Sequence, residues 1–322
     1  MEPIRGIHHI TAMASDPQVN LDFYQTVLGQ RLIKTTVNFD DPGTYHLYYG
    51  DETGTPGTLL TFFPWPTARP GVPGNGEVSA IAYAIGPESV DFWAARLKEF
   101  QVSVGESKER FGQTVIPFRD PDGMMLELVT SQDHAAVEWW TDGPVPEDHI
   151  IQGFYGATLW VDNASQTGRL LQEHMGYSHA GTEDARHRYV GAGENIGLVI
   201  DLLERPDQPR ARLGAGSVHH IAFQTINDNE QQEYLSFLRQ QGYQVTPVQD
   251  RQYFNSIYFR EPNGVLFELA TNGPGFLIDE SVDELGSNLR LPPWYESHRA
   301  EIEQALQPLD RKIKLATEME AE

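Results

Sequence analysis

The stretch EPNGVLFELA, residues 261–270, decides the fold because it recurs earlier in the chain as DPDGMMLELV, residues 120–129. Two further stretches share its register, GTLLTFF at 57–63 and GLVIDLL at 197–203. In all four, a glycine stands four residues before the same position, which is occupied by Thr61, Glu127, Asp201 and Glu268. Proline at the second and glycine at the fourth position of a tetrapeptide favour a tight turn that leads into a strand. The repetition therefore predicts four copies of one structural unit.

Each copy begins with a short apolar segment that follows a glycine or a turn and has the length of a strand. These segments span residues 7–13, 78–85, 154–161 and 218–225. A helix-like stretch follows each one, at residues 17–28, 88–99, 163–174 and 228–241. Further strand-like runs complete each copy, so the predicted order is strand, helix and three strands. The predicted units cover residues 7–63, 78–130, 153–203 and 217–271.

One such unit cannot close its own sheet, so the units are expected to pair around shared cores. The predicted fold class is α+β, with four βαβββ units paired into two modules whose mixed sheets are cup-shaped. Segments rich in proline and glycine separate the units and predict an N-terminal domain at 1–145 and a C-terminal domain at 150–280. Residues 281–322 are predicted to form a C-terminal extension.

The charge balance excludes several classes of function. The 322 residues carry a formal charge of −23, which argues against binding to nucleic acid or to anionic lipid. The chain lacks cysteine, so disulfides and thiolate metal sites are excluded. The start MEPIRGIHHI is unlike a signal peptide, and no apolar run is long enough for a membrane span. The expected location is cytoplasmic, and homo-oligomerisation stays open.

Histidine doublets occur twice, as His8-His9 and His219-His220, and both lie in the first strand of a unit. The corresponding positions in units two and three are Ala80 and Gly156. The strand therefore forms without histidine, and folding alone does not explain the doublets. If units one and four share a sheet, the doublets approach one another and also approach Glu268.

Side chains alternate between the two faces of a strand, so strict alternation allows one histidine of each doublet to face the cup. We assign that role to His9 and His220, because Thr11 and Ala222 then share their face. With Glu268 they form two imidazoles and one carboxylate, which is the facial triad of non-haem iron(II) enzymes. The other histidines, His46 among them, have no counterpart in the repeat and are interpreted as structural.

Over about residues 5–275 the chain resembles the vicinal oxygen chelate superfamily, which includes glyoxalase I, bleomycin-resistance proteins and extradiol dioxygenases. The four βαβββ units and the histidine and glutamate positions carry this resemblance. The hydroquinone and chlorohydroquinone ring-cleaving branch is most similar, through GIHHIT at 6–11, DPGTYHLYYGD at 41–51, FFPW at 62–65 and PPW at 292–294. The resemblance implies metal ligands from units one and four.

The resemblance further implies an Fe(II)-dependent dioxygenase that binds a small aromatic substrate and O2. It implies roles around the metal for His8, Thr11, His219, Arg251 and Tyr258. Tyr258 could hydrogen-bond the substrate, and Arg251 could offset the negative charge of a phenolate. Phe62, Phe254, Phe259 and Phe267 are candidate walls of a ring pocket, although at least half of them are expected in the core.

Several alternatives remain at this point. A glyoxalase-type lyase or isomerase would need a fourth protein ligand, and that position holds Thr61. A binding protein of the bleomycin-resistance kind would not need the triad. An extradiol site built wholly from the C-terminal half would need a histidine where Gly156 stands, so that alternative is discarded. Mn(II) could replace Fe(II), and no motif identifies the ring substituents.

Overall fold

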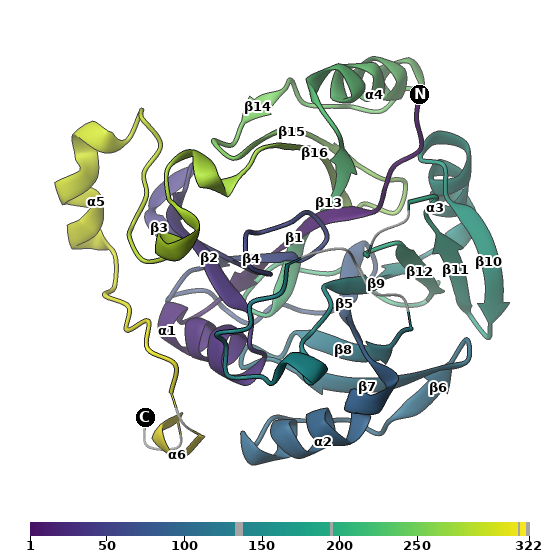
Figure 1. Ribbon diagram of the computed structural model, residues 1–322. Coiled ribbons are helices and arrows are strands. Elements are labelled where there is room, and N and C mark those ends of the chain that lie inside the picture. The colour runs from purple at the N-terminus through teal and green to yellow at the C-terminus, as the bar shows by residue number, and fades with distance from the viewer. Residues whose placement is uncertain (133–137, 194–195, 315, 320–322) are drawn as a thin grey trace.

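The computed structural model describes residues 1–322 except 133–137, 194–195, 315 and 320–322, and contains two eight-stranded sheets (Figure 1). The fold is α+β, and each repeat unit is a strand, a helix and three strands. Unit one comprises β1 Ile7–Ala14, α1 Pro17–Leu21, β2 Arg31–Asn38, β3 Asp41–Gly50 and β4 Leu59–Pro64. Unit two comprises β5 Glu77–Ile85, α2 Val90–Glu99, β6 Lys108–Arg110, β7 Gln113–Arg119 and β8 Met125–Thr130.

The third and fourth units have the same order of elements. Unit three comprises β9 Phe154–Val161, α3 Ala164–Arg169, β10 Ser178–Glu183, β11 Arg186–Val190 and β12 Val199–Glu204. Unit four comprises β13 Ser217–Thr225, α4 Asp228–Gln240, β14 Gln249–Asp250, β15 Phe254–Arg260 and β16 Leu266–Pro274. Turns of π-helix at Asp22–Val27 and Leu170–His174 continue α1 and α3. The extension contains α5 Arg299–Ala305 and α6 Ala316–Met319.

Units one and four share one sheet, in the order β14-β15-β16-β13-β1-β4-β3-β2. Units two and three share the other, in the order β10-β11-β12-β9-β5-β8-β7-β6. The antiparallel pairs β1–β13 and β5–β9 join the units at the centre of each sheet. Each sheet thus takes one unit from either half of the chain. The division into residues 1–145 and 150–280 refers to the order along the chain, and it stays a prediction.

The turns before the last strands of units two and four form as their sequences predict. Gly123 and Gly264 have positive φ angles of 86° and 98°, a conformation that glycine adopts without a steric cost. Asp120 accepts a hydrogen bond from the main-chain N–H of Met124 through Oδ1, at 2.7 Å. The first residue of the turn therefore ties the start of the strand to the turn itself.

A β-bulge interrupts the first strand of every unit. In β1 the pairing passes from Ile7 to His9, and in β13 it passes from Val218 to His220. The second sheet skips Ser79 in the same way, and it skips a residue in β9. A bulge places two residues of one strand opposite a single partner and shifts the alternation by one. The bulges recur in all four units, so they belong to the fold and not to the histidines.

The burial pattern of β1 records this shift. Ile7 and Ile10 both lie in the main hydrophobic core, although they are three residues apart on a strand. His8 and His9 lie between them and occupy the other side. The large apolar side chains of the core, including Tyr24, Trp93 and Phe223, pack with the isoleucines at below 2% exposure. Burial of this apolar surface stabilises the sheets by roughly 25 cal/mol for each Å² removed from water.

The C-terminal extension returns to the sheet of units one and four. Arg290 donates its main-chain N–H to the carbonyl of Thr35 in β2, at 2.9 Å. The Tyr295 hydroxyl donates to the carbonyl of Phe39 at 2.8 Å, and the Trp294 ring lies 5.6 Å from the Phe39 ring. The extension therefore holds the β2–β3 connection from outside.

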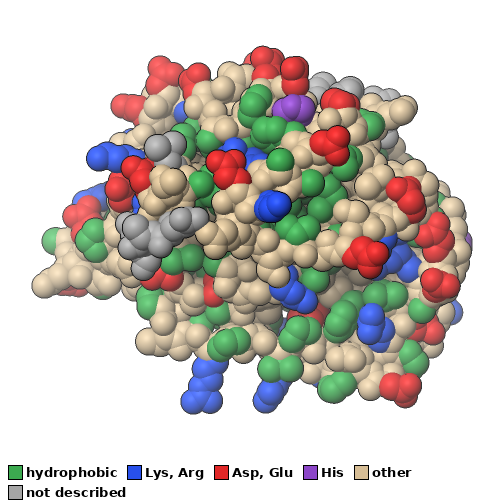
Figure 2. All heavy atoms as spheres, turned by 90° about the horizontal axis from the view of Figure 1, so that it is seen from below, with side chains coloured by type: hydrophobic (Ala, Val, Ile, Leu, Met, Phe, Trp, Pro, Cys, Tyr) green, Lys and Arg blue, Asp and Glu red, His purple; other side chains and the backbone are tan. Residues whose placement is uncertain are grey.

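Acidic side chains are spread over the face of the molecule seen in Figure 2, consistent with the charge of −23. No helix among the described residues is long and apolar enough to cross a membrane.

Candidate metal centre and cavity

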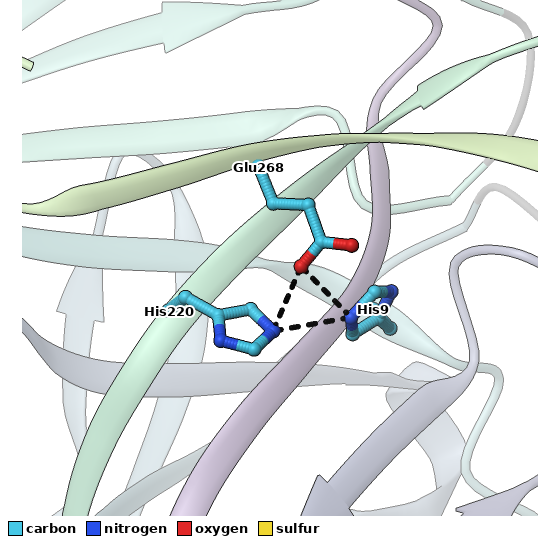
Figure 3. Close-up of side chains that lie close together, drawn as sticks. All are labelled: His9, His220 and Glu268. Atoms are coloured by element: carbon cyan, nitrogen blue, oxygen red, sulfur yellow. Dashed lines mark hydrogen bonds and ion pairs between the residues drawn. The ribbon is translucent and has the colours of Figure 1, made fainter. Parts of the chain in front are cut away.

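His9, His220 and Glu268 converge at the centre of the first sheet, from strands β1, β13 and β16 (Figure 3). His9 Nε2 lies 3.3 Å from His220 Nε2 and 3.4 Å from Glu268 Oε2. His220 Nε2 lies 2.9 Å from the same carboxylate oxygen. All three residues are buried, at 5% exposure or less. In the part of the chain that the structure describes, this is the one such cluster of potential metal-ligating side chains.

These distances fit three ligands of one metal ion. Two ligand atoms bound at about 2.1 Å and at right angles to one another lie about 3.0 Å apart. The three measured separations fall close to that value, so a single ion between them would have three ligands on one face. Apart from the two imidazoles, no described residue donates a hydrogen bond to the buried Glu268 Oε2. A cation at this place would satisfy that oxygen.

Ser256 on β15 fixes the other carboxylate oxygen, because its hydroxyl donates to Glu268 Oε1. This leaves Oε2 directed at the two imidazoles (Figure 3). Burial alone would raise the pKa of Glu268, but the facing His9 and His220 hold that pKa well below its usual value. Burial lowers the pKa of His220. A carboxylate and a neutral imidazole are the protonation states that bind a divalent metal.

Strict alternation predicts that His8 and His219 point away from the cup. The structure shows that this prediction is wrong. The bulges bring each of them to the same side as its neighbour. His8 Nδ1 lies 2.9 Å from His9 Nδ1, and His219 Nδ1 lies 2.8 Å from His220 Nδ1. Burial, followed by the adjacent imidazole, lowers the pKa of both His8 and His219 to about 3. Both rings are therefore neutral at pH 7.

This contact sets the tautomer of the ligand. A histidine that binds metal through Nε2 carries its proton on Nδ1. The Nδ1–H of His9 then donates to Nδ1 of His8, and His220 donates to His219 in the same way. The alternation rule fails here because it holds only for a regular strand. The three-residue spacing of Ile7 and Ile10 was the sequence signal for the bulge.

A chain of hydrogen bonds runs from Thr11 to Tyr48. Thr11 Oγ1 lies 2.8 Å from Thr61 Oγ1, and Thr61 Oγ1 lies 2.9 Å from His46 Nε2. The Tyr48 hydroxyl lies 2.8 Å from His46 Nδ1. Burial, followed by the charge of His9, lowers the pKa of His46 well below its usual value. His46, which was interpreted as structural from the sequence, thus lines the cavity, and so does Tyr48.

Tyr258 and Arg251 form the opposite wall. The Arg251 Nε donates to the Tyr258 hydroxyl at 3.2 Å, and Arg251 Nη1 lies 3.3 Å from Asp40 Oδ2. Tyr258 pairs with Glu268 across β15 and β16, and its ring lies 5.7 Å from that of His220. Burial, followed by the charge of Glu268, raises the pKa of Tyr258. The hydroxyl therefore stays protonated and can donate a hydrogen bond.

These walls enclose a cavity of about 360 Å³ beside the candidate metal ligands. Its aromatic lining includes Phe39, Phe63 and Phe254. Phe254 is the one predicted wall that lines it; Phe62, Phe259 and Phe267 belong to the hydrophobic core. A cavity of this size and apolar lining suits a small ring compound with a few polar groups. Residues that the sequence did not indicate also line it: Asn38, Asp40, Thr246, Gln249 and Leu266.

Comparison with known proteins agrees with this architecture. Residues 6–128 and 146–269 match the family described as the Glyoxalase/Bleomycin resistance protein/Dioxygenase superfamily. The chain is 49% identical over 305 residues to a Bacillus subtilis (strain 168) protein provisionally named ring-cleaving dioxygenase MhqO, with 95% of this chain and 96% of that protein covered.

Two other proteins extend the comparison. The chlorohydroquinone/hydroquinone 1,2-dioxygenase of Sphingobium indicum is 35% identical over 311 residues, which cover 94% of this chain and 95% of that protein. A crystal structure of a provisionally named dioxygenase from Bacillus subtilis subsp. subtilis strain 168 superposes with a TM-score of 0.93 at 47% identity, covering 97% of this chain and 99% of that one. With its repeated units, paired sheets and matching sequence, the chain belongs to the Glyoxalase/Bleomycin resistance protein/Dioxygenase superfamily.

Proposed function

We propose that the chain is a ring-cleaving dioxygenase that opens a hydroxylated aromatic ring with Fe(II) held by His9, His220 and Glu268. The observation that carries this proposal is the convergence of three buried ligand atoms within 4.8 Å of one another. Two histidines and one carboxylate with open positions are typical of non-haem iron(II) oxygenases. A bound Fe(II) would supply the electron transfer to O2, which side chains alone do not. Mn(II) accepts the same ligands.

The names of the relatives support the reaction class and suggest the substrate. One relative is named for ring cleavage, and another for chlorohydroquinone and hydroquinone. The alignments cover more than nine tenths of this chain and of each relative, at 49% and 35% identity. This similarity favours the same chemistry here. We infer a substrate with two ring hydroxyls, of the hydroquinone or catechol type.

The cavity side chains have distinct proposed roles toward this substrate. Phe63 and Phe254 are proposed to hold the ring between apolar surfaces. Tyr258, which stays protonated, donates a hydrogen bond to a ring oxygen, and the charge of Arg251 offsets a phenolate. His8 and His219 are proposed to orient the two ligand imidazoles. Thr11 anchors Thr61 and thereby His46.

Thr61 argues against a glyoxalase-type lyase. It occupies the position in unit one that Glu268 occupies in unit four, where a fourth ligand would have to stand. Its hydroxyl lies at hydrogen-bond distance from both Thr11 and His46, at 2.8 and 2.9 Å. A neutral hydroxyl in that network is a poor ligand for a divalent ion. The open positions of the triad are thus left for substrate and O2.

The test is anaerobic loading of the protein with Fe(II), followed by oxygen-uptake measurements on a panel of hydroquinones and catechols. We expect consumption of one O2 for each ring opened, together with the absorbance of a conjugated ring-opened product. Oxygen uptake without a ring-opened product would contradict the proposal. So would turnover of none of these compounds by protein that holds a full equivalent of iron.

A matched pair of variants controls for iron that is bound elsewhere. His220→Ala removes a proposed ligand and should abolish the uptake. His179→Ala changes an exposed histidine of β10 and should leave the uptake at the wild-type rate. Equal activity in both variants would mean that the reaction does not use this centre.

A further inference from the structure

We propose that the cup of the second sheet is a binding site for a small oxyanion, held mainly by Arg186 beside the paired Arg110. This inference is independent of the proposed function, because it concerns strands β5 to β12 and not the candidate metal ligands. A cavity of about 480 Å³ lies on this sheet, and both arginines line it. The site occupies the place that corresponds to the metal centre of the first sheet.

Strand pairing gives the correspondence between the two cups. Glu268 on β16 pairs with Tyr258 on β15, and Glu127 on β8 pairs in the same way with Pro117 on β7. Glu127 thus stands where Glu268 stands. Arg110 closes the β6–β7 turn as Arg251 closes the β14–β15 turn.

Units one and three correspond in the same manner. Thr61 on β4 pairs with Thr11 and Tyr48, whereas Asp201 on β12 pairs with Thr158 and Arg188. Arg188 therefore replaces Tyr48. Two residues earlier on the same strands, Arg186 replaces His46.

The second cup has no place for the histidine pair. Ala80 stands at the position of His220, and Gly156 stands at the position of His9. A Cβ atom added to Gly156 would lie 2.1 Å from the carbonyl oxygen of Val199, so this backbone leaves no room for any side chain. Compared with the first cup, the second therefore has guanidinium groups and no imidazoles at these positions.

Two of these guanidinium groups are neutralised by the carboxylates of the cup. Arg110 forms two hydrogen bonds of 2.7 Å with Glu127. Arg188 forms two of 2.9 Å with Asp201. Such paired contacts match the planar fork of arginine to both oxygens of a carboxylate. Arg110 and Arg188 are 7% and 6% exposed, so these pairs are buried.

Arg186 is the third guanidinium, and it has no carboxylate to itself. Its Nη1 donates to Thr158 at 2.7 Å and to Asp201 at 3.1 Å, and Arg188 already pairs with that aspartate. Its other nitrogens form no hydrogen bond with the described residues. Burial, followed by the charge of Arg110, lowers the pKa of Arg186, so the cup disfavours this positive charge. Lys108 adds a further cation to the lining.

Four acidic side chains line the cavity, Glu77, Glu106, Asp122 and Glu127, against five basic ones, Lys108, Arg110, Arg119, Arg186 and Arg205. Glu77 accepts a hydrogen bond from Gly74, and Asp122 accepts hydrogen bonds from Ser15. Glu106 is exposed. An anion that reaches Arg186 would therefore meet a local excess of positive charge in a molecule whose surface is strongly acidic (Figure 2).

The ligand is identified by its chemistry as a small molecule with a carboxylate or phosphate group. Both groups accept paired hydrogen bonds from guanidinium nitrogens. Thr158 adds a hydroxyl at the same place, and the side of the cavity formed by Val78, Ala80 and Trp160 offers apolar surface for the remainder of the ligand.

The test is isothermal titration calorimetry of the full chain with inorganic phosphate and, separately, with maleate, at constant ionic strength. We expect saturable binding of one anion per chain, with a dissociation constant below about 10 mM for at least one of the two. Binding of phosphate alone or of maleate alone would support the site and assign its class. Saturable binding of neither would overturn the proposal.

Four variants locate the binding. Arg186→Gln should weaken it at least tenfold, and Arg239→Gln, which removes the same charge from an exposed position of helix α4, should not. Ala80→Glu places a carboxylate at the cup without removing an existing contact, and it should also abolish binding. His220→Ala should leave binding unchanged, because the metal centre lies on the other sheet. Binding lost in His220→Ala and kept in Arg186→Gln would place the anion at the metal centre and refute the inference.

Discussion

The surroundings of the Glu268 carboxylate make the centre suited to bind a cation. Ser256 donates a hydrogen bond to one of its oxygens, and the second lies 3.4 Å from His9 Nε2 and 2.9 Å from His220 Nε2. The bulges then let His8 and His219 contact the ligand imidazoles from behind. Each residue of the centre is therefore positioned by a neighbour that does not itself face the proposed metal position.

Tyr258→Phe should lower kcat/KM for a hydroquinone by about 10- to 100-fold, because it removes one hydrogen-bond donor from the substrate pocket. Iron content should not change. Steady-state oxygen uptake measures the effect, with Tyr243→Phe, a half-buried tyrosine on the far side of β15, as the control. A rate equal to that of the wild type would exclude a role for this hydroxyl.

His8→Gln should alter the pH dependence of stability in metal-free protein. The pKa of His8 is lowered to about 3 in the folded state, so between pH 6.5 and 3 the unfolded chain binds a proton that the folded chain does not. Protonation of the unfolded chain therefore destabilises the fold as pH falls through this window, by up to about 1.4 kcal/mol per pH unit.

Denaturant unfolding of wild type and variant at matched pH values measures this effect as a difference. The comparison matters because buried acids such as Asp120, whose pKa is raised to about 7 by burial, act in the opposite direction in both proteins. The free energy of unfolding of the wild type should fall relative to that of the variant below pH 6.5. A constant difference down to pH 4 would contradict the assignment.

At the scale of elements, the segment that leads into the extension is attached to β2 through a buried ion pair. Lys34 is fully buried and lies 2.6 Å from Asp279, and it also pairs with Glu280, which is buried. Beyond these residues, Tyr295 contacts the main chain of Phe39, which lines the cavity beside the candidate metal ligands. The extension thus supports one wall of the proposed active site from outside.

Lys34→Met should lower the free energy of unfolding by about 3–5 kcal/mol, because it leaves the carboxylate of Glu280 buried without its closest partner. Chemical denaturation measures the loss. Arg299→Gln breaks exposed ion pairs with Glu296 and Glu303 and should cost less than about 1 kcal/mol. Similar losses in the two variants would mean that the Lys34 cluster adds nothing beyond a surface pair.

Sequence reasoning reached the pairing of units one and four because histidine doublets occur only there. It placed His9, His220 and Glu268 on one cup because, once units one and four share a sheet, their first and last strands bring these positions together. Strict alternation directed His8 and His219 away from the cup, because it does not foresee a bulge, whereas the family resemblance implied roles around the metal for both. It left His46 as structural, because in the repeat its counterpart is Arg186, and the comparison of units offered no matching histidine.

At the scale of the whole molecule, the candidate centre needs both ends of the chain. His9 comes from the first strand of unit one, and His220 and Glu268 come from unit four. The two sheets also contact one another through β5 and β13, so each supports the other. This arrangement gives two cups of one architecture with different chemistry, one with histidines and one with arginines.

Separate expression of residues 1–145 and 150–322 should give fragments that each bind no stoichiometric Fe(II), because neither contains the whole ligand set. Co-expression should restore one equivalent if the halves associate through β1 and β13, and size-exclusion chromatography with metal analysis would reveal it. A stoichiometric iron site in either fragment alone would contradict the assignment of ligands to both ends of the chain.

The most direct test of the central claim is metal analysis after anaerobic loading with Fe(II) and extensive dialysis. Wild-type protein should retain one equivalent of iron, and His9→Ala, His220→Ala and Glu268→Ala should each retain far less while keeping a wild-type circular dichroism spectrum. A folded variant of any of these three residues that still holds a full, tightly bound equivalent would contradict the claim.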